Sequence, residues 1–284
     1  MRSSNPVFTR RGFSRESGYA GFNAGQPQTG TPYAGSPNNP YAQPGNPYAQ
    51  PQAGPDGMMQ QGAGTRPGVM TIDSVVSRTA ITLGTVVATA TVAWIMDLPI
   101  GIGILCALVG MGLGLWQAFK SEPSPPLILA YAAVQGVFLG VISNYVNQWV
   151  PGAAMQAVIG TMAVFAGVLF MYKQRIIRVN ARFTKFVMAA AVGFMLLMAV
   201  NMIVAFIGGG DGLGLRSGGL GILFGVLGII LGACFLALDF KMVEDGVAYG
   251  APEKESWLAA FGLTMTLIWI YLEFLRLIAI LQGD

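Results

Sequence analysis

The sequence predicts an all-α membrane protein in which seven transmembrane helices follow a disordered N-terminal tail. Hydrophobic residues make up 54% of the 284 residues and charged residues only 10%, with a mean hydropathy of +0.58. A chain with so little polar material cannot coat a soluble globule of this size. After a polar start, seven apolar segments of about 20 residues or more follow, which suits a hydrocarbon core about 30 Å thick.

The tail is the first of two predicted regions and covers residues 1–68. It is rich in Gly, Pro, Gln, Asn and Tyr, and the sequence NPYAQP occurs twice, at Asn39–Pro44 and at Asn46–Pro51. Such a composition cannot bury enough apolar surface to offset the entropy lost on ordering. We therefore expect a disordered tail that contributes nothing to the packed part of the protein.

The second region, residues 69–284, contains the predicted spans. The first two are separated only by Asp97–Pro99, which fits a tight hairpin because proline is tolerated in the first turn of a helix. The seven predicted spans are Val75–Met96, Leu98–Phe119, Leu127–Val146, Ala153–Tyr172, Phe186–Phe206, Leu220–Phe240 and Trp257–Leu281.

Basic residues in the short connections predict the orientation of the chain. They gather near the tail and in the even-numbered connections, whereas the odd-numbered connections carry only Arg216. The excess of Lys and Arg in cytoplasmic loops places the tail inside and, with seven spans, the C-terminus outside. The basic residues on the cytoplasmic side are Arg66, Arg78, Lys120, Lys173, Arg175, Arg178, Arg182, Lys185, Lys241 and Lys254.

Several function classes are disfavoured by the composition. The chain has no histidine, which removes histidine-based catalytic triads and the HExxH zinc site, and it has no GxxxxGK[ST] phosphate loop. The net charge is only +3, and its basic residues are dispersed, so a nucleic-acid partner is not indicated. We expect neither an enzyme nor a bound cofactor or metal.

Two acidic side chains, Asp239 and Glu273, lie inside apolar segments. An ionised carboxylate in hydrocarbon costs about 2.5 to 3.5 kcal/mol even on the insertion scales that give the lowest values. A chain that keeps one there usually supplies an internal partner, water or a proton. These two carboxylates are therefore the first candidates for a functional site.

The block from Leu238 to Leu281, LDFKMVEDGVAYGAPEKESWLAAFGLTMTLIWIYLEFLRLIAIL, resembles the C-terminal signature of the Bax inhibitor-1 family, in particular its actinobacterial branch. The opening MRSSNPVF and the ITLG of the first span are similar too. The resemblance implies a multi-pass protein of the bacterial plasma membrane whose last helix is central. Characterised relatives are linked to a pH-sensitive calcium leak. In them, two aspartates on the sixth and seventh helices share a proton and an arginine on the second helix assists.

Carried over to this sequence, the resemblance places the first aspartate at Asp239 in LDF. The partner on the seventh helix is Glu273 if YLE is matched to the YLD of the relatives. It is Thr266 if positions are counted from Leu275-Arg276. The second span contains no arginine, so that part of the relatives' arrangement is absent.

Two arrangements of these groups are open. In the first, Asp239 meets Glu273, and because two carboxylates in a dry site cannot both ionise, they share a proton and form a pH gate. In the second, Asp239 lies near the cytoplasmic mouth beside Thr266, Lys241 or water, and Glu273 pairs with Arg276 at i+3. Positions equally far from the turn of an antiparallel hairpin lie at equal depth, which favours the second arrangement.

From these observations we expect an ion-leak pathway or a regulator of ion balance, with carboxylates giving cation preference and a response to pH. Membrane lipid and calcium or other cations are the expected partners, because hard divalent ions prefer oxygen ligands. The alternative is a non-conducting membrane scaffold that regulates other membrane proteins, for example a membrane protease.

Overall fold

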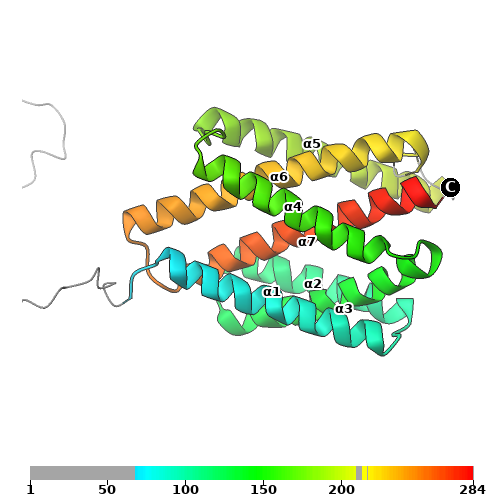
Figure 1. The fold of residues 1–284 in the computed structure, drawn as a ribbon, viewed down its shortest axis with the longest axis horizontal. Coiled ribbons are helices and arrows are strands. Elements are labelled where there is room, and N and C mark those ends of the chain that lie inside the picture. The colour runs from blue at the N-terminus through cyan, green and yellow to red at the C-terminus, as the bar shows by residue number, and fades with distance from the viewer. Residues whose placement is uncertain (1–67, 209–212, 216, 284) are drawn as a thin grey trace, which may run out of the picture. The chain divides into compact units, whose positions relative to one another are not determined.

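The computed structural model describes residues 68–208, 213–215 and 217–283, and over these residues it is built from seven helices without a strand. Each helix is long and apolar enough to cross a membrane (Figure 1). The predicted all-α membrane fold is confirmed, while the predicted tail lies outside the described residues except for Gly68. The helices are α1 Ile72–Ile95, α2 Ile100–Phe119, α3 Pro125–Trp149, α4 Ala153–Lys173, α5 Ala181–Gly208, α6 Gly218–Tyr249 and α7 Glu255–Gln282.

The predicted spans agree with the helices within a few residues, except at the end of α6 and the start of α5. The apolar part of α6 ends at Phe240, but the helix continues to Tyr249 and reaches 32 residues, or about 48 Å. No proline interrupts α6 before Gly250, whose φ of +69° ends the helix with a left-handed residue. At α5, the Asn180 side chain accepts a hydrogen bond from the Phe183 amide at 2.8 Å and so caps the helix five residues before the predicted start.

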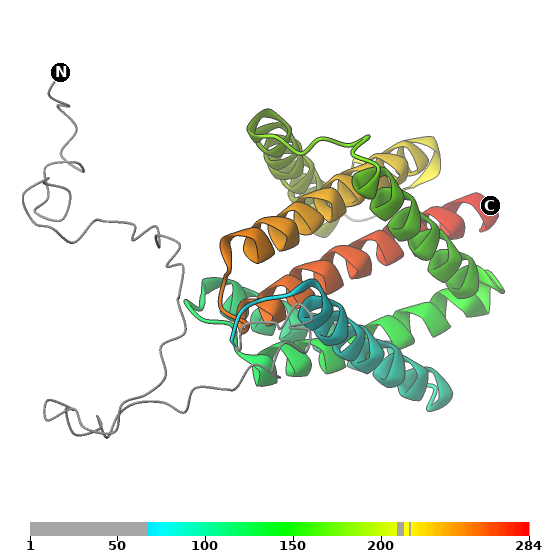
Figure 2. The same cartoon turned by 60° about the vertical axis from the view of Figure 1, so that its left-hand side comes forward.

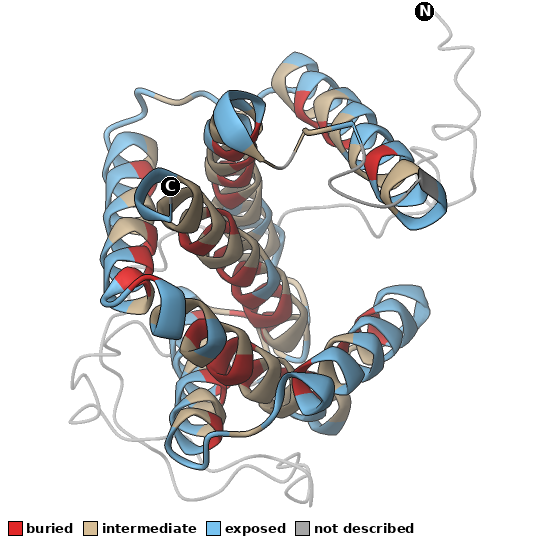
Figure 3. Ribbon diagram, turned by 90° about the vertical axis from the view of Figure 1, so that its right-hand side faces the viewer, coloured by how far each residue is buried: buried red, intermediate tan, exposed pale blue. Residues whose placement is uncertain are grey.

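The last helix is the central one, as predicted. It contacts α1, α3, α4 and α6 (Figures 1 and 2), and its buried side chains run along most of its length, from Ser256 to Leu275. At the periphery α2 packs on α3, and α5 packs on α6. Buried residues face the other helices while exposed residues cover the outside (Figure 3), and many of the exposed ones are large and apolar. This is the distribution that a lipid environment requires.

The contact between α1 and α3 is close enough to depend on glycine. A Cβ atom added to Gly136 would collide with the carbonyl oxygen of Val86, and one added to Gly140 would collide with that of Ala90. Small residues at such positions let helix backbones approach each other, and this approach gains van der Waals contact in the membrane. Gly136 and Gly140, one helical turn apart, therefore serve helix packing.

The residues that precede α1 in the chain, 68–71, form a short strap that ties the first helix to the α6–α7 hairpin. The Met70 amide donates to the Ala251 carbonyl at 2.8 Å, and the Glu253 amide donates to the Gly68 carbonyl at 2.8 Å. The Met70 side chain is only 3% exposed and packs into the core formed by α1, α4, α6 and α7. Gly68, the last residue of the predicted tail, thus bonds the connection between α6 and α7.

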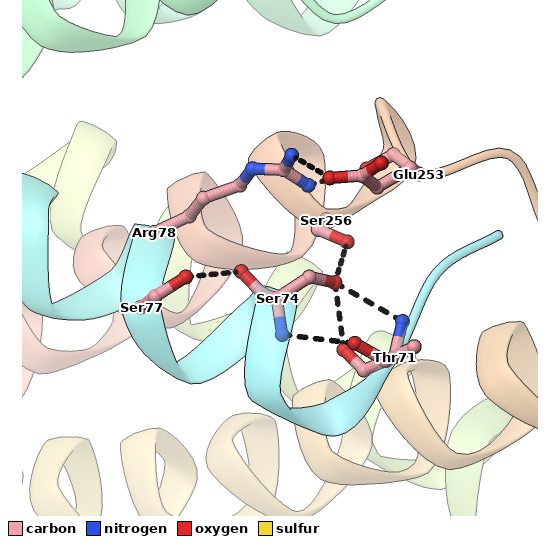
Figure 4. Close-up of polar contacts among 6 residues, drawn as sticks. All are labelled: Thr71, Ser74, Ser77, Arg78, Glu253 and Ser256. Carbon is pink, nitrogen blue, oxygen red and sulfur yellow. Dashed lines mark hydrogen bonds and ion pairs between the residues drawn. The ribbon is translucent and has the colours of Figure 1, made fainter. Parts of the chain in front are cut away.

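Polar side chains reinforce the strap (Figure 4). Arg78 on α1 forms an ion pair with Glu253 at 2.6 Å and lies over the Trp257 ring, 5.5 Å from its centre. The Ser74 hydroxyl bonds the Ser256 hydroxyl at 2.7 Å. The start of α1 is therefore fixed to the start of α7.

Two deletions separate the tail from the strap. Removal of Met1–Gly64 is expected to leave the melting temperature of the purified protein unchanged, because the strap and its contacts remain. Removal of Met1–Thr71 takes away buried Met70 and the cap of α1, losses worth about 2 to 5 and about 1 kcal/mol respectively, and is expected to lower the melting temperature by several degrees. Equal melting temperatures of the two deletion variants in detergent would contradict the structural role of the strap.

Candidate functional site

Asp239 lies where α6 faces α7, near the end of the bundle that carries the strap. Its Oδ2 atom accepts a hydrogen bond from the Thr266 hydroxyl at 2.6 Å. On the same side of α7, a Cβ atom added to Gly262 would lie 3.4 Å from Asp239 Oδ1. The carboxylate is half-buried. It therefore points at the central helix, where a glycine leaves room for it and a hydroxyl binds it.

Glu273 lies about two turns further along α7 and has a partner on its own helix. Its Oε2 atom is 2.6 Å from Arg276 Nη2, and the two side chains are only 9% and 14% exposed. Both rest on glycines of α6: a Cβ atom at Gly228 would lie 2.9 Å from Glu273 Cδ, and one at Gly225 would lie 3.4 Å from the guanidinium. The two glycines make room for a buried ion pair between the helices.

The structure therefore shows the second of the two predicted arrangements, with Asp239 beside Thr266 and Glu273 beside Arg276. Gly228, which lies against Glu273, precedes Asp239 by eleven residues along α6, or about 16 Å at 1.5 Å per residue. At that separation the two carboxylates do not share a proton. Asp239 of α6 and Thr266 of α7 lie at similar depth because both are about equally far from the turn, as expected for an antiparallel hairpin.

The basic groups suggested by the sequence or the resemblance are not beside Asp239. Lys241 instead pairs with Asp245 at 2.6 Å, one turn on along α6. The second helix packs on α3 and has no basic residue between Ile100 and Phe119. Thr266 is thus the one side chain among those expected that bonds the Asp239 carboxylate.

Sequence reasoning missed a contact between α4 and α6 beyond Asp239. The Tyr172 hydroxyl donates a hydrogen bond to Glu244, and the rings of Phe165 and Tyr172 lie against Phe240, with centres 5.8 and 5.7 Å away. No sequence motif marks this contact. The only available signal was the position of Tyr172 at the end of an apolar run, where tyrosine often finds a polar partner.

The face of α7 that looks toward α1 and α3 carries hydroxyl pairs. Thr264 bonds Thr82 at 2.9 Å, and Tyr271 bonds Ser143 at 2.6 Å. Such bonds hold helices together in a medium that offers no water. The central helix thus has two polar faces, one made of hydroxyls and one that carries Thr266 and Glu273 toward α6.

Two cavities of the structure are lined by neither of the two carboxylates. One of about 810 Å³ is lined by α5 and by Trp269, and another of about 320 Å³ lies beside Asp97 and Asn144, whose side chains are joined by a hydrogen bond of 2.6 Å. In the described part of the chain, no three histidine, cysteine or acidic side chains gather in a group that could hold a metal ion.

Comparison with known proteins covers nearly the whole chain. A family model described as Bax inhibitor 1 like matches residues 5–283. The match includes most of the N-terminal region and is thus wider than the resemblance seen in the sequence. No curated protein matches the chain.

The buried ion pair gives a prediction about stability. Glu273→Gln or Arg276→Gln leaves one charge of the pair between α6 and α7, and removal of one partner from a buried pair costs about 3 to 5 kcal/mol. Replacement of both by apolar residues, Glu273→Leu with Arg276→Met, is expected to cost less than either single change. Unfolding in mild detergent measures all three variants. Single variants that unfold like the parent would show that the pair contributes nothing to packing.

Proposed function

The chain belongs to the Bax inhibitor 1 like family, and on that premise we propose that it is a cation-leak protein of the bacterial plasma membrane. Calcium is the cation to test first. The observation that carries the proposal is the position of Asp239, a carboxylate kept inside the contact between two apolar helices and held there by a single side-chain hydroxyl.

The chemistry of the Asp239–Thr266 pair suits a passing cation. A carboxylate in a medium of low dielectric constant attracts cations strongly, and hard divalent ions prefer oxygen ligands. The Thr266 hydroxyl now donates to the carboxylate, but a hydroxyl rotates freely and its oxygen also has lone pairs for an ion. Asp239 and Thr266 together offer a partial oxygen shell that a hydrated cation can enter step by step.

A single carboxyl group also provides a response to pH. Protonation of Asp239 removes the charge that attracts the cation and weakens the bond from Thr266, because a hydrogen bond to an ionised acceptor is roughly twice as strong as one to a neutral group. The proposed switch differs from the one implied by the family resemblance, where two aspartates share a proton. Here Glu273 has a structural role in its pair with Arg276.

The proposed orientation puts the strap end of the bundle in the cytoplasm and the C-terminal end outside. Basic residues support it: the connections at the strap end carry Lys120, the five cations between Lys173 and Lys185, and Lys254. At the opposite end, residues 97–99 and 150–152 carry no basic side chain. The asymmetry is the one expected from the positive-inside rule.

Calcium flux into liposomes loaded with a calcium dye tests the role of Asp239. The parent protein is expected to show flux that varies with external pH, whereas Asp239→Asn is expected to show a flux that no longer depends on pH, because its amide does not titrate. Glu244→Gln, which removes an acid beyond the apolar part of α6, serves as the matched control and is expected to keep the pH dependence.

Two results would count against the proposal. A pH dependence that survives in Asp239→Asn would mean that another group senses protons. If the parent shows no flux at any pH, the leak itself is wrong, and a non-conducting scaffold that regulates other membrane proteins becomes the better explanation.

A further inference from the structure

We propose that the connection between α4 and α5 is a binding site for the headgroups of anionic lipids. This connection and the adjoining helix ends carry five basic residues within thirteen positions, and all five side chains are exposed. We call the stretch from Lys173 to Lys185 the basic segment. Its cations are Lys173, Arg175, Arg178, Arg182 and Lys185.

The length of α4 places the basic segment at headgroup level. The helix has 21 residues and is about 31 Å long, which matches a hydrocarbon core of about 30 Å. Because Lys173 is its last residue, the cations begin where the hydrocarbon ends. The segment lies at the same end of the bundle as the α6–α7 hairpin (Figure 1), and the connection is visible between α4 and α5 in Figure 2.

Three other basic residues at this end of the bundle have carboxylate partners. Arg78 pairs with Glu253, Lys241 pairs with Asp245, and Lys254 pairs with Glu122 at 2.9 Å. The hydrogen bond and charge of Lys254 lower the pKa of the Glu122 carboxyl. These cations therefore already have a partner within the chain.

The basic segment differs from these residues because its cations lack carboxylate partners within the described part of the chain. Among the described residues none of its five cations is in an ion pair. The sequence has no acidic residue between Ala153 and Gly210. On the neighbouring helix α6, Asp245 pairs with Lys241, whereas Glu244 accepts only from the neutral Tyr172 hydroxyl and keeps its negative charge. One such carboxylate does not balance five cations, so the segment presents a net positive charge.

Packing against the core and backbone hydrogen bonds fix the backbone of the basic segment. Ile177 and Val179 pack against the core beneath them, and the Ile176 amide donates to the Met171 carbonyl at 3.0 Å. Asn180 caps the start of α5. The cations therefore project from a fixed turn, which lowers the entropy lost when an anion binds.

Exposed apolar side chains beside the cations select a lipid as the partner instead of an acidic protein. Ile176 is 65% exposed and Phe186 is 71% exposed. Arg182, Lys185 and Phe186 occupy one face of α5 at spacings of three and four residues, and Val187 on the other face is buried against α6. A lipid phosphate can therefore bind the cations while its acyl chain lies along Phe186, on the side of the membrane core.

Lipid preference in reconstituted full-length protein tests the site. Spin-labelled phosphatidylglycerol and phosphatidylcholine measure how strongly each lipid associates with the protein surface. The variant Arg178→Gln/Arg182→Gln/Lys185→Gln is compared with Lys120→Gln/Lys241→Gln/Lys254→Gln, which removes the same charge from the same end of the bundle. Circular dichroism and melting temperature check that both variants are folded.

The parent is expected to prefer phosphatidylglycerol at least threefold at low salt, since one basic side chain at a membrane surface contributes up to about fivefold. The basic-segment variant is expected to lose most of this preference and the control variant to keep most of it. Addition of inorganic phosphate at millimolar concentration separates a free anion from a lipid: the lipid site predicts that the preference persists.

Three outcomes would overturn the proposal. One is a parent without lipid preference, which would point to an acidic protein surface as the partner. Another is an equal loss in both triple variants, which would indicate a diffuse charge effect instead of a site. The third is complete competition by inorganic phosphate, which would assign the site to the free anion.

Discussion

Hydrocarbon offers no hydrogen bonds, so the polar side chains of the central helix must find their partners inside the protein. Helix α7 meets this constraint with a separate partner for each of four polar side chains. Thr264 and Tyr271 bond hydroxyls of α1 and α3, Thr266 bonds Asp239 of α6, and Glu273 pairs with Arg276 on α7 itself. These bonds set how the surrounding helices are placed around α7 and at what depth α6 lies against it.

The separate pairing assigns different roles to the two acids in the apolar segments. The Glu273–Arg276 pair fills the space that Gly225 and Gly228 leave in α6, so its charge is matched and its position is part of the packing. Asp239 is bound by one neutral hydroxyl, and its charge is not compensated by a basic side chain in the contact that the structure shows. This difference is the physical reason for assigning the proposed cation and proton chemistry to Asp239 alone.

The sequence was sufficient for the fold, because segment length and hydropathy determine which parts of a chain cross a bilayer. It also narrowed the site, since hairpin symmetry favoured Thr266 over Glu273 as the partner of Asp239. It did not reveal the strap: Met70 lies outside every predicted span, and its burial depends on a backbone pairing with Ala251, far away in the chain. Arg78 was assigned only to orientation, although it bonds Glu253.

The central claim is that Asp239 is coupled to Thr266 and not to Glu273. Double-mutant cycles on unfolding stability measure this coupling most directly, with Asp239→Asn combined first with Thr266→Val and then with Glu273→Gln. We expect a coupling energy of about 1 kcal/mol for Asp239 with Thr266 and one close to zero for Asp239 with Glu273. A large coupling between the two acids, with none to Thr266, would contradict this account.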